Sequence, residues 1–321
     1  DGGDILLGYT EQTLLGFDLE SRSFVPLQPM PSLYRGPTDS FEHIDISRDV
    51  NGDGNDDAVL PHFDGWQLAL RHRGAFTEPQ LVGPAAQRGF ANGNQVAYRS
   101  QSLYLMDHDM DGRDDLAFYD DGEFAVHHRP GETDFDVTPD LLPTHLSNVH
   151  DDFMSLSIGT DVDNPEHRQG VLGDVEDING DGLADLIVFV LEGEGIFGRE
   201  TSYEIHYGKS VDGRLGFAKE PSTIVASDGI QVANERIDLE DDGRMELVTI
   251  SVDLGIGTIV RALLTRSVRL DLSMYKLGVD GYPEEPNERR QITATFDFSS
   301  GDVYVPSFAA ADINGDGLKD L

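Results

Sequence analysis

The sequence contains no cysteine, only one tryptophan and few basic residues. Without cysteine the chain has no disulfide framework, no thiolate nucleophile and no cysteine-bound zinc. Its longest largely apolar stretch, residues 183–191 with Asp185 inside it, is far shorter than the roughly 18 residues that a membrane-spanning helix needs. The 23 Lys and Arg residues face 60 Asp and Glu, and the resulting net charge of −37 repels nucleic acid and anionic lipid surfaces. We therefore expect no nucleic-acid partner and no membrane insertion.

A nine-residue acidic motif recurs five times along the chain. Each copy places an oxygen-bearing side chain at positions 1, 3, 5 and 9 and a glycine at position 6. The copies begin at Asp49, Asp107, Asp177, Asp238 and Asp312. Successive starts lie 58, 70, 61 and 74 residues apart, a spacing that indicates a repeat architecture.

Short strands are predicted after each motif. An apolar run that is typical of a buried strand follows the first four motifs, at residues 58–60, 116–118, 186–189 and 247–250. A turn and a second alternating strand come next, which favours a hairpin. A glycine and an aromatic residue recur further on, at residues 74–76, 131–135, 216–217 and 281–282, and we expect this signal to start an outer strand.

About four strands per period and almost no helical periodicity favour the blades of a β-propeller over solenoid coils. We expect one all-β propeller domain over residues 1–321, built of four-stranded blades. Its five units cover about residues 4–56, 57–114, 115–184, 185–245 and 246–319. If residues 5–8 pair with the last strand around 303–311, the five blades close a ring; the alternative is a fragment of a ring with six to eight blades.

The spacing of the motif favours a calcium site. Alternate positions aim carboxylate or amide oxygens at one point, glycine permits the sharp turn, position 7 offers its carbonyl, and the acid at position 9 closes the cage. Hard oxygen ligands in this number suit Ca²⁺ better than Mg²⁺. A helix-loop-helix calcium hand is excluded because it needs Glu at position 12, where this chain has Leu60, Phe118, Val188 and Thr249. Asp and Gly also form turns without metal, but five motifs in register favour the ion.

We expect four to five bound Ca²⁺ ions. The predicted metal-binding positions are Asp49, Asn51, Asp53, Asn55 and Asp57; Asp107, Asp109, Asp111, Arg113 and Asp115; Asp177, Asn179, Asp181, Leu183 and Asp185; Asp238, Glu240, Asp242, Arg244 and Glu246; and Asp312, Asn314, Asp316, Leu318 and Asp320. The fourth loop has Glu at positions 3 and 9, and we expect these longer side chains to hold the ion less tightly. Because the unliganded loops crowd carboxylates together, we expect calcium to stabilise the fold.

The repeated loop, followed by a hydrophobic strand, resembles the FG-GAP and VCBS repeats. These repeats form blades in the N-terminal propellers of integrin α-subunits and in many bacterial secreted or surface proteins. The segment 308–321 is similar to the VCBS form, whereas the chain has neither a clear FG…GAP tripeptide signature nor an inserted domain. The resemblance implies a bacterial calcium-binding propeller, in which the loop joins the first two strands of each blade and the ions lie on one face of the disc.

Three classes of function remain after these steps. The favoured class is a non-catalytic adhesion or interaction module that binds an extracellular protein or a glycan. The alternatives are a carbohydrate-active protein, either a lectin or a polysaccharide lyase, and a structural subunit of a surface assembly. A secreted or cell-surface location is expected because such loops fill where calcium is millimolar. Neither the partner nor the oligomeric state follows from the sequence.

No catalytic residue is predicted, because the chain has no nucleophile elbow, phosphate loop or HExxH zinc motif. His127 and His128 are adjacent on a strand and therefore face opposite sides, and His108 points away from its loop's metal. Trp66 stands nine residues after Asp57, as Phe124 does after Asp115, which makes it a core position of the repeat.

Two further features are candidates for partner contact. The basic clusters at residues 71–73 and 289–290 are either holders of an acidic sugar or parts of solvated hairpins. The segment 140–169 is the preferred contact region, because nothing in the repeat requires it.

Overall fold

The structure is a computed structural model. It describes residues 5–10, 12–34, 45–92, 95–151, 168–194, 198–227, 229–239, 242, 244–253, 255–278, 281–297 and 302–304. The fifth acidic loop, Glu240 and most of the predicted contact region 140–169 lie outside the described residues. The chain divides into two compact units, residues 1–143 with 210–216 and residues 144–209 with 217–321.

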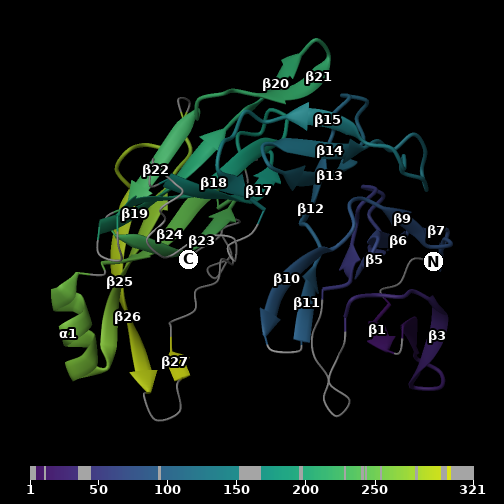
Figure 1. The fold of residues 1–321 in the computed structure, drawn as a ribbon, viewed down its shortest axis with the longest axis horizontal. Helices are drawn as coiled ribbons and strands as arrows, with labels where there is room; N and C mark the ends of the chain where they lie inside the picture. The colour runs from purple at the N-terminus through teal and green to yellow at the C-terminus, as the bar shows by residue number, and fades with distance from the viewer. Residues whose placement is uncertain are drawn as a thin grey trace. The chain divides into compact units, whose positions relative to one another are not determined.

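Three antiparallel sheets form the first unit (Figure 1). One contains β1 (Leu7–Thr10), β2 (Thr13–Asp18) and β3 (Ser23–Pro29) in that order. The next contains β4 (Ser47–Arg48), β5 (Asp57–His62), β6 (Gly65–Ala69) and β9 (Gln80–Val82). The third contains β12 (Leu103–Met106), β13 (Asp115–Asp120), β14 (Glu123–His127) and β15 (Asp140–Pro143).

Three two-stranded ribbons accompany the sheets. They are β7 (Arg71–His72) with β8 (Ala75–Phe76), β10 (Gln87–Asn92) with β11 (Gln95–Arg99), and β20 (Gly208–Val211) with β21 (Arg214–Phe217). Residues 210–216 of the last ribbon belong to the first unit, since the backbone N–H of Leu215 donates to the His108 carbonyl at 2.8 Å.

Two five-stranded sheets form the second unit. One contains β16 (Val149–His150), β17 (Arg168–Glu176), β18 (Asp185–Glu194), β19 (Gly198–His206) and β22 (Thr223–Ser227). The other contains β23 (Ile230–Ile237), β24 (Glu246–Val252), β25 (Ser267–Tyr275), β26 (Glu288–Asp297) and β27 (Asp302–Tyr304). Only β16 pairs in parallel among these described strands.

The apolar runs after the acidic motifs are buried strands, as predicted. β13 is buried from Asp115 to Tyr119, and every residue of β24 is buried. In the first unit, Val59 of β5, Leu68 of β6 and Phe118 of β13 share one core cluster, so the side chains of two sheets form a common core. The expected all-β class is therefore correct.

The acidic loop occupies the same place in four sheets. It connects β4 to β5, β12 to β13, β17 to β18 and β23 to β24, and each of these pairs is antiparallel. In each of these sheets the strand before the loop thus comes from the end of one sequence unit and the strand after the loop from the start of the next. The repeat of the sequence is in this way a repeat of local structure.

Two predictions about individual elements are wrong. The glycine and aromatic signal does not start the outer strands, because β9, β15, β22 and β26 begin five or more residues after the signal's glycine. Its aromatic side chains instead fill the cores, as Phe135 and Phe217, both 3 % exposed, show. A turn was expected directly after the apolar run 247–250, but the helix α1 (Ile256–Thr265) stands between β24 and β25. No helix among the described residues is long and apolar enough to cross a membrane.

Candidate metal centre

Glycine at position 6 gives the acidic loops their sharp turn. Gly54, Gly112 and Gly182 have φ angles of 81°, 85° and 85°, in the left-handed region that side chains with a Cβ rarely adopt. A Cβ on any of the three would have open space around it, so the requirement comes from the backbone angle and not from crowding. The role predicted for this glycine is confirmed.

The side chains at positions 1, 3 and 5 accept hydrogen bonds from the backbone of their own loop. In the first loop both oxygens of Asp49 accept backbone hydrogen bonds, from Asp53 at 3.2 Å and Gly54 at 2.8 Å. Asn51 accepts a second bond from the Asp53 N–H at 3.0 Å, and Asp53 accepts from Asn55 at 2.9 Å. The loops at Asp107 and Asp177 repeat the same bonds at 2.7–3.2 Å.

The acid at position 9 is buried and fastens two backbone segments. Asp57 accepts the N–H of Val50 at 3.1 Å and of Arg71 at 2.7 Å, and Asp185 accepts those of Ile178 at 3.0 Å and Gly208 at 2.8 Å. Burial raises the pKa of Asp57 to about 6 and that of Asp185 to about 7, against the lowering effect of these bonds. Sequence reasoning assigned this residue to the metal alone and missed its structural role.

The fourth loop keeps part of this scheme. Asp238 accepts the Asp242 N–H at 3.1 Å, and Asp242 accepts the Arg244 N–H at 3.0 Å. Glu246, although longer than Asp, still accepts the Leu239 N–H at 2.8 Å. The predicted ligands Asp312, Asn314, Asp316, Leu318 and Asp320 lie outside the described residues, as does Glu240.

The donor set of the second loop fits a hard divalent cation. Asp107, Asp109 and Asp115 each offer a carboxylate oxygen, and these three oxygens lie within 4.8 Å of one another. A carboxylate oxygen that already accepts one backbone hydrogen bond keeps a lone pair for a cation. Asp111 is additionally paired with the Arg113 guanidinium, which lowers the pKa of Asp111.

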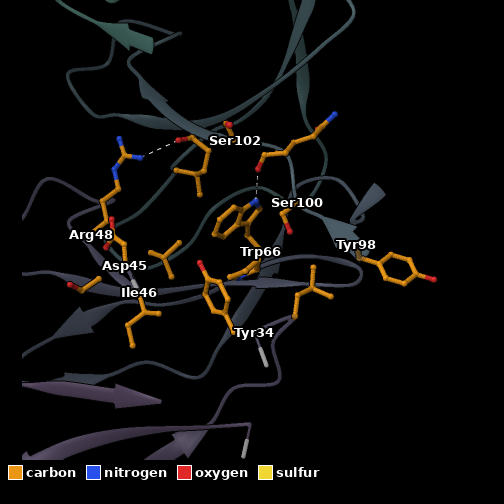
Figure 2. Close-up of a pocket in the computed structure, with 14 residues that line it drawn as sticks. Tyr34, Asp45, Ile46, Arg48, Trp66, Tyr98, Ser100 and Ser102 are labelled. Atoms are coloured by element: carbon orange, nitrogen blue, oxygen red, sulfur yellow. Dashed lines mark hydrogen bonds between the residues drawn. The ribbon is translucent and has the colours of Figure 1, made fainter. Parts of the chain in front are cut away.

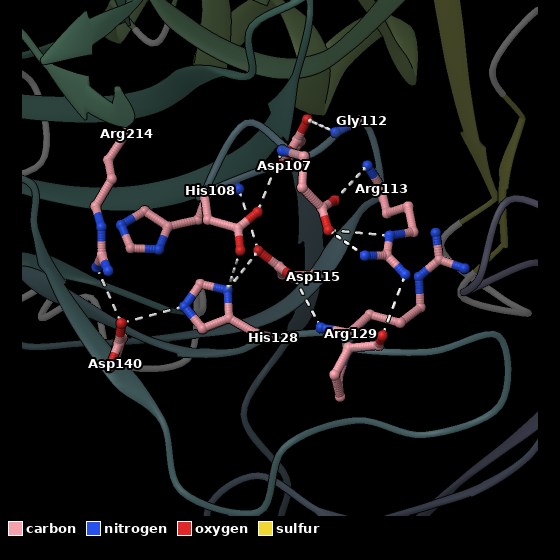
Figure 3. A network of polar contacts seen from close by, with 12 residues as sticks. Asp107, His108, Gly112, Arg113, Asp115, His128, Arg129, Asp140 and Arg214 are labelled. Atoms are coloured by element: carbon pink, nitrogen blue, oxygen red, sulfur yellow. Dashed lines mark hydrogen bonds and ion pairs between the residues drawn. The ribbon is translucent and has the colours of Figure 1, made fainter. Parts of the chain in front are cut away.

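A histidine and carboxylate network adjoins the second loop (Figure 3). His128 Nδ1 lies 3.0 Å from Asp115 Oδ2, and His128 Nε2 lies 3.2 Å from Asp140 Oδ2. Arg214 donates to the same Asp140 oxygen at 2.9 Å. His108 lies beside His128, with ring centroids 5.3 Å apart and planes inclined by 19°.

The pKa values of the two histidines in this network are shifted in opposite directions. Burial lowers the pKa of His108, and His128 and Arg214 lower it further. Burial also disfavours a charged His128, but Asp115, Asp140 and Asp109 outweigh it and raise the pKa of His128. Sequence reasoning treated His108 as incidental and missed Asp140 and Arg214, since no local signal joins residues so far apart in the chain.

A pocket of about 520 Å³ lies in the first unit (Figure 2). Tyr34 and Trp66 face its interior, whereas the ring of Tyr98, which is 49 % exposed, points away from them. Arg48 lines one side and donates to the Leu103 carbonyl at 3.1 Å. The wall thus combines aromatic faces with polar groups, the mixture that small-molecule sites usually carry.

The other residues singled out in the sequence take ordinary positions. Trp66 packs against the core cluster of its unit and donates Nε1–H to the Gln101 carbonyl at 3.1 Å. His127 is buried, and its Nδ1 contacts the Asp136 carbonyl at 2.7 Å, away from the contacts of His128. Arg289 and Arg290 pair with Glu285 and Glu288, both at 2.6 Å, in exposed positions.

Comparison with known proteins assigns no family. No family model matches the chain, and no curated protein matches it. Among solved structures, the chain is similar to an Agrocybe aegerita lectin that specifically recognises non-reducing terminal N-acetylglucosamine. The identity is 13 %, the match covers 89 % of this chain and 76 % of that one, and the TM-score is 0.37. Similarity at this level establishes neither the fold nor the ligand of this chain.

Proposed function

We propose that this chain is a calcium-stabilised β-propeller of the FG-GAP and VCBS type, which acts outside the cytosol as a binding module without catalysis. The observation that carries the proposal is the repetition of one hydrogen-bond scheme in three acidic loops, each of which joins the same two strands of its sheet. A single loop of this kind is explained by turn chemistry alone. Three equivalent loops, and a fourth that keeps part of the scheme, favour a shared ligand.

The residues at positions 1, 3, 5 and 9 are the side chains that would hold calcium. In the second loop they include Asp107, Asp109 and Asp115, whose oxygens converge. Bound calcium supplies positive charge where three carboxylates otherwise repel one another. The loop connects two strands of a buried sheet, so this neutralisation supports the sheet itself.

A glycan is the partner that the pocket of the first unit supports. Aromatic faces stack on the apolar faces of sugar rings, while the Arg48 guanidinium and the polar wall suit their hydroxyl or carboxylate groups. No arrangement of nucleophile and base appears among the pocket residues that the structure describes, which favours binding over turnover. An extracellular protein partner is the alternative.

Thermal unfolding with metal quantification tests the calcium part of the proposal. The purified chain should contain four to five calcium ions by mass spectrometry, and chelation with EGTA should lower its Tm by more than about 10 °C. Restored calcium should recover the Tm, whereas magnesium should recover little of it. Absence of bound calcium together with an unchanged Tm after chelation would contradict the proposal.

Glycan-array screening followed by titration tests the binding part. Tyr34→Ala should weaken binding of the selected glycan by about tenfold, because stacked aromatic contacts of this kind contribute roughly 1–2 kcal/mol. Phe24→Ala removes an aromatic residue outside the pocket, 40 % exposed, and should leave the affinity unchanged. Equal losses in both variants would remove the pocket from the binding site.

A further inference from the structure

The second acidic loop differs from the first at two positions. Position 2 is Val50 in the first loop and Ile178 in the third, both fully buried, but it is His108 in the second. The acid at position 9 also accepts the backbone N–H of a residue that follows the hairpin, Arg71 in the first loop and Arg129 in the second. The residue just before this donor is Leu70 in the first loop and His128 in the second. Since Val50 and Leu70 share one apolar core cluster, the second loop has an imidazole pair where the first has an aliphatic pair.

One nitrogen of this pair lacks a hydrogen-bond partner. His108 is 3 % exposed, and its buried Nδ1 has no partner among the described residues. A buried polar atom without a partner is costly, and an aliphatic residue of the kind found in the other loops would avoid the cost. The imidazole therefore needs a role that Val or Ile cannot fill.

The neighbouring His128 is held between two carboxylates. Its Nε2 faces Asp140, which Arg214 holds in turn, and its Nδ1 faces Asp115 at 3.0 Å. A carboxylate that fixes one ring nitrogen of a histidine is the usual outer support of a metal ligand, because it orients the ring toward the ion. The Nδ1 of His128 and the oxygen of Asp115 then need a positive centre between them, which is either a proton or a metal.

We propose that His108, His128 and Asp115 form a binding site for a divalent transition-metal cation of the Zn²⁺ class, which shares Asp115 with the second acidic loop but adds two imidazole donors. One ligand atom from each of the three residues lies within 4.8 Å of the others. Two imidazoles on one tetrahedral ion, with bonds of about 2.0–2.1 Å, place their ring centres roughly 5 Å apart. The observed separation of 5.3 Å matches that spacing.

The donor types select the metal. Two imidazole nitrogens and one carboxylate suit Zn²⁺, Co²⁺ or Ni²⁺, whereas Ca²⁺ prefers oxygen ligands throughout. Three protein ligands leave the fourth tetrahedral position to water. The site occurs at one of the four partly or fully described loops, so one ion per chain is expected, and calcium bound in the second loop would compete for the shared Asp115.

Titration in calcium-free buffer tests the proposal, because Asp115 is also a predicted calcium ligand of the second loop. Isothermal titration of ZnCl₂ into the chain should give one bound equivalent. Co²⁺ should give the visible absorption of a tetrahedral nitrogen and oxygen site. Histidine NMR signals from two residues should shift with the same stoichiometry.

Matched variants assign the site. His108→Val installs the residue that the first loop has, and His128→Leu installs the residue equivalent to Leu70, so each should fold and lose Zn²⁺ affinity by at least about tenfold. His72→Gln changes a histidine outside the cluster and should bind zinc as the unaltered chain does. Circular dichroism verifies the fold of each variant, and either ligand variant alone suffices if the other does not fold. Absence of zinc binding, or zinc binding that survives both ligand substitutions, would overturn the proposal.

Discussion

At position 9 of the acidic loops, one carboxylate serves two neighbouring segments of backbone. Asp185 is fully buried and accepts one N–H from its own loop and one from the residue that follows β19 by two positions. The acid at position 5, in contrast, is exposed and bonds only within the loop. The sequence presents both as calcium ligands, but their burial predicts different contributions to the fold without metal.

Asp185→Asn should therefore destabilise the metal-free protein. The amide keeps one acceptor oxygen and turns an N–H₂ group toward a backbone donor, which costs about 2–3 kcal/mol in the free energy of unfolding. Asp181→Asn, at the exposed position 5 of the same loop, should cost less than about 1 kcal/mol. Urea denaturation in the presence of EDTA measures both. Similar losses would show that the buried bonds to Ile178 and Gly208 add nothing to stability.

Glu204 on β19 gives the second prediction at this scale. Burial alone would raise its pKa, but His206 and Arg168 outweigh burial and lower it. A lowered pKa in the folded state adds stability above the ordinary glutamate pKa, and that stability is lost as the pH falls through the folded value. Glu204→Gln should thus cost about 1–2 kcal/mol at pH 7 and almost nothing near pH 2.

Urea titrations across this pH range, with EDTA throughout, follow the difference between the two proteins. Glu192→Gln is the matched control, because Glu192 approaches the same Arg168 at 3.5 Å with a side chain that is 58 % exposed. That variant should change the free energy of unfolding by only a few tenths of a kcal/mol. A Glu204→Gln effect that stays constant with pH would exclude the ion pair as its source.

Among elements, the buried strands were predictable and the irregular ones were not. Apolar runs such as Leu186–Phe189 follow a fixed acidic motif, and burial on both faces leaves a continuous hydrophobic signature. The helix α1 has glycine at its start, no acidic residue in its first turn and no side-chain cap, so it lacks start signals. The network of His108 and His128 was also unpredictable, because Asp140 and Arg214 join it from distant parts of the chain.

The turn after β9 gives a prediction about how neighbouring sheets pack. Gly83 has a φ angle of 86°, and a Cβ at this position would lie 2.5 Å from the ring of the buried Phe118 on β13. Gly83→Ala should lower the free energy of unfolding by about 2–4 kcal/mol, since it adds backbone strain and displaces a core ring.

Gly54→Ala is the control for backbone strain alone. Gly54 has a φ angle of 81°, and a Cβ at this position would have no neighbouring atom within 4 Å, so the cost should be about 1 kcal/mol. Urea denaturation in EDTA compares the two variants. Equal costs would indicate that Phe118 moves aside freely and that the sheets of the first unit do not pack tightly at this turn.

For the whole molecule, charge is the dominant property. Twenty of the 60 Asp and Glu residues lie in the five acidic loops, and five calcium ions would reduce the net charge of −37 only to −27. Self-repulsion of this size opposes the compact state. Stability should therefore depend on mobile ions as well as on bound calcium, and the two dependences can be separated.

Screening by salt should stabilise the calcium-free protein strongly and the calcium-saturated protein weakly. Raising NaCl from 10 mM to 1 M shortens the Debye length from about 30 Å to about 3 Å, which removes most repulsion between exposed carboxylates. In EDTA the Tm should rise by about 5–10 °C over this range, whereas with millimolar calcium the rise should be less than half as large, because the most crowded carboxylates are already neutralised. Differential scanning calorimetry measures both series, and NaCl with sodium sulfate at equal ionic strength separates screening from salting-out. An equal rise in both series would mean that the acidic loops are not where the repulsion lies, and the charge would then have to act through the rest of the surface.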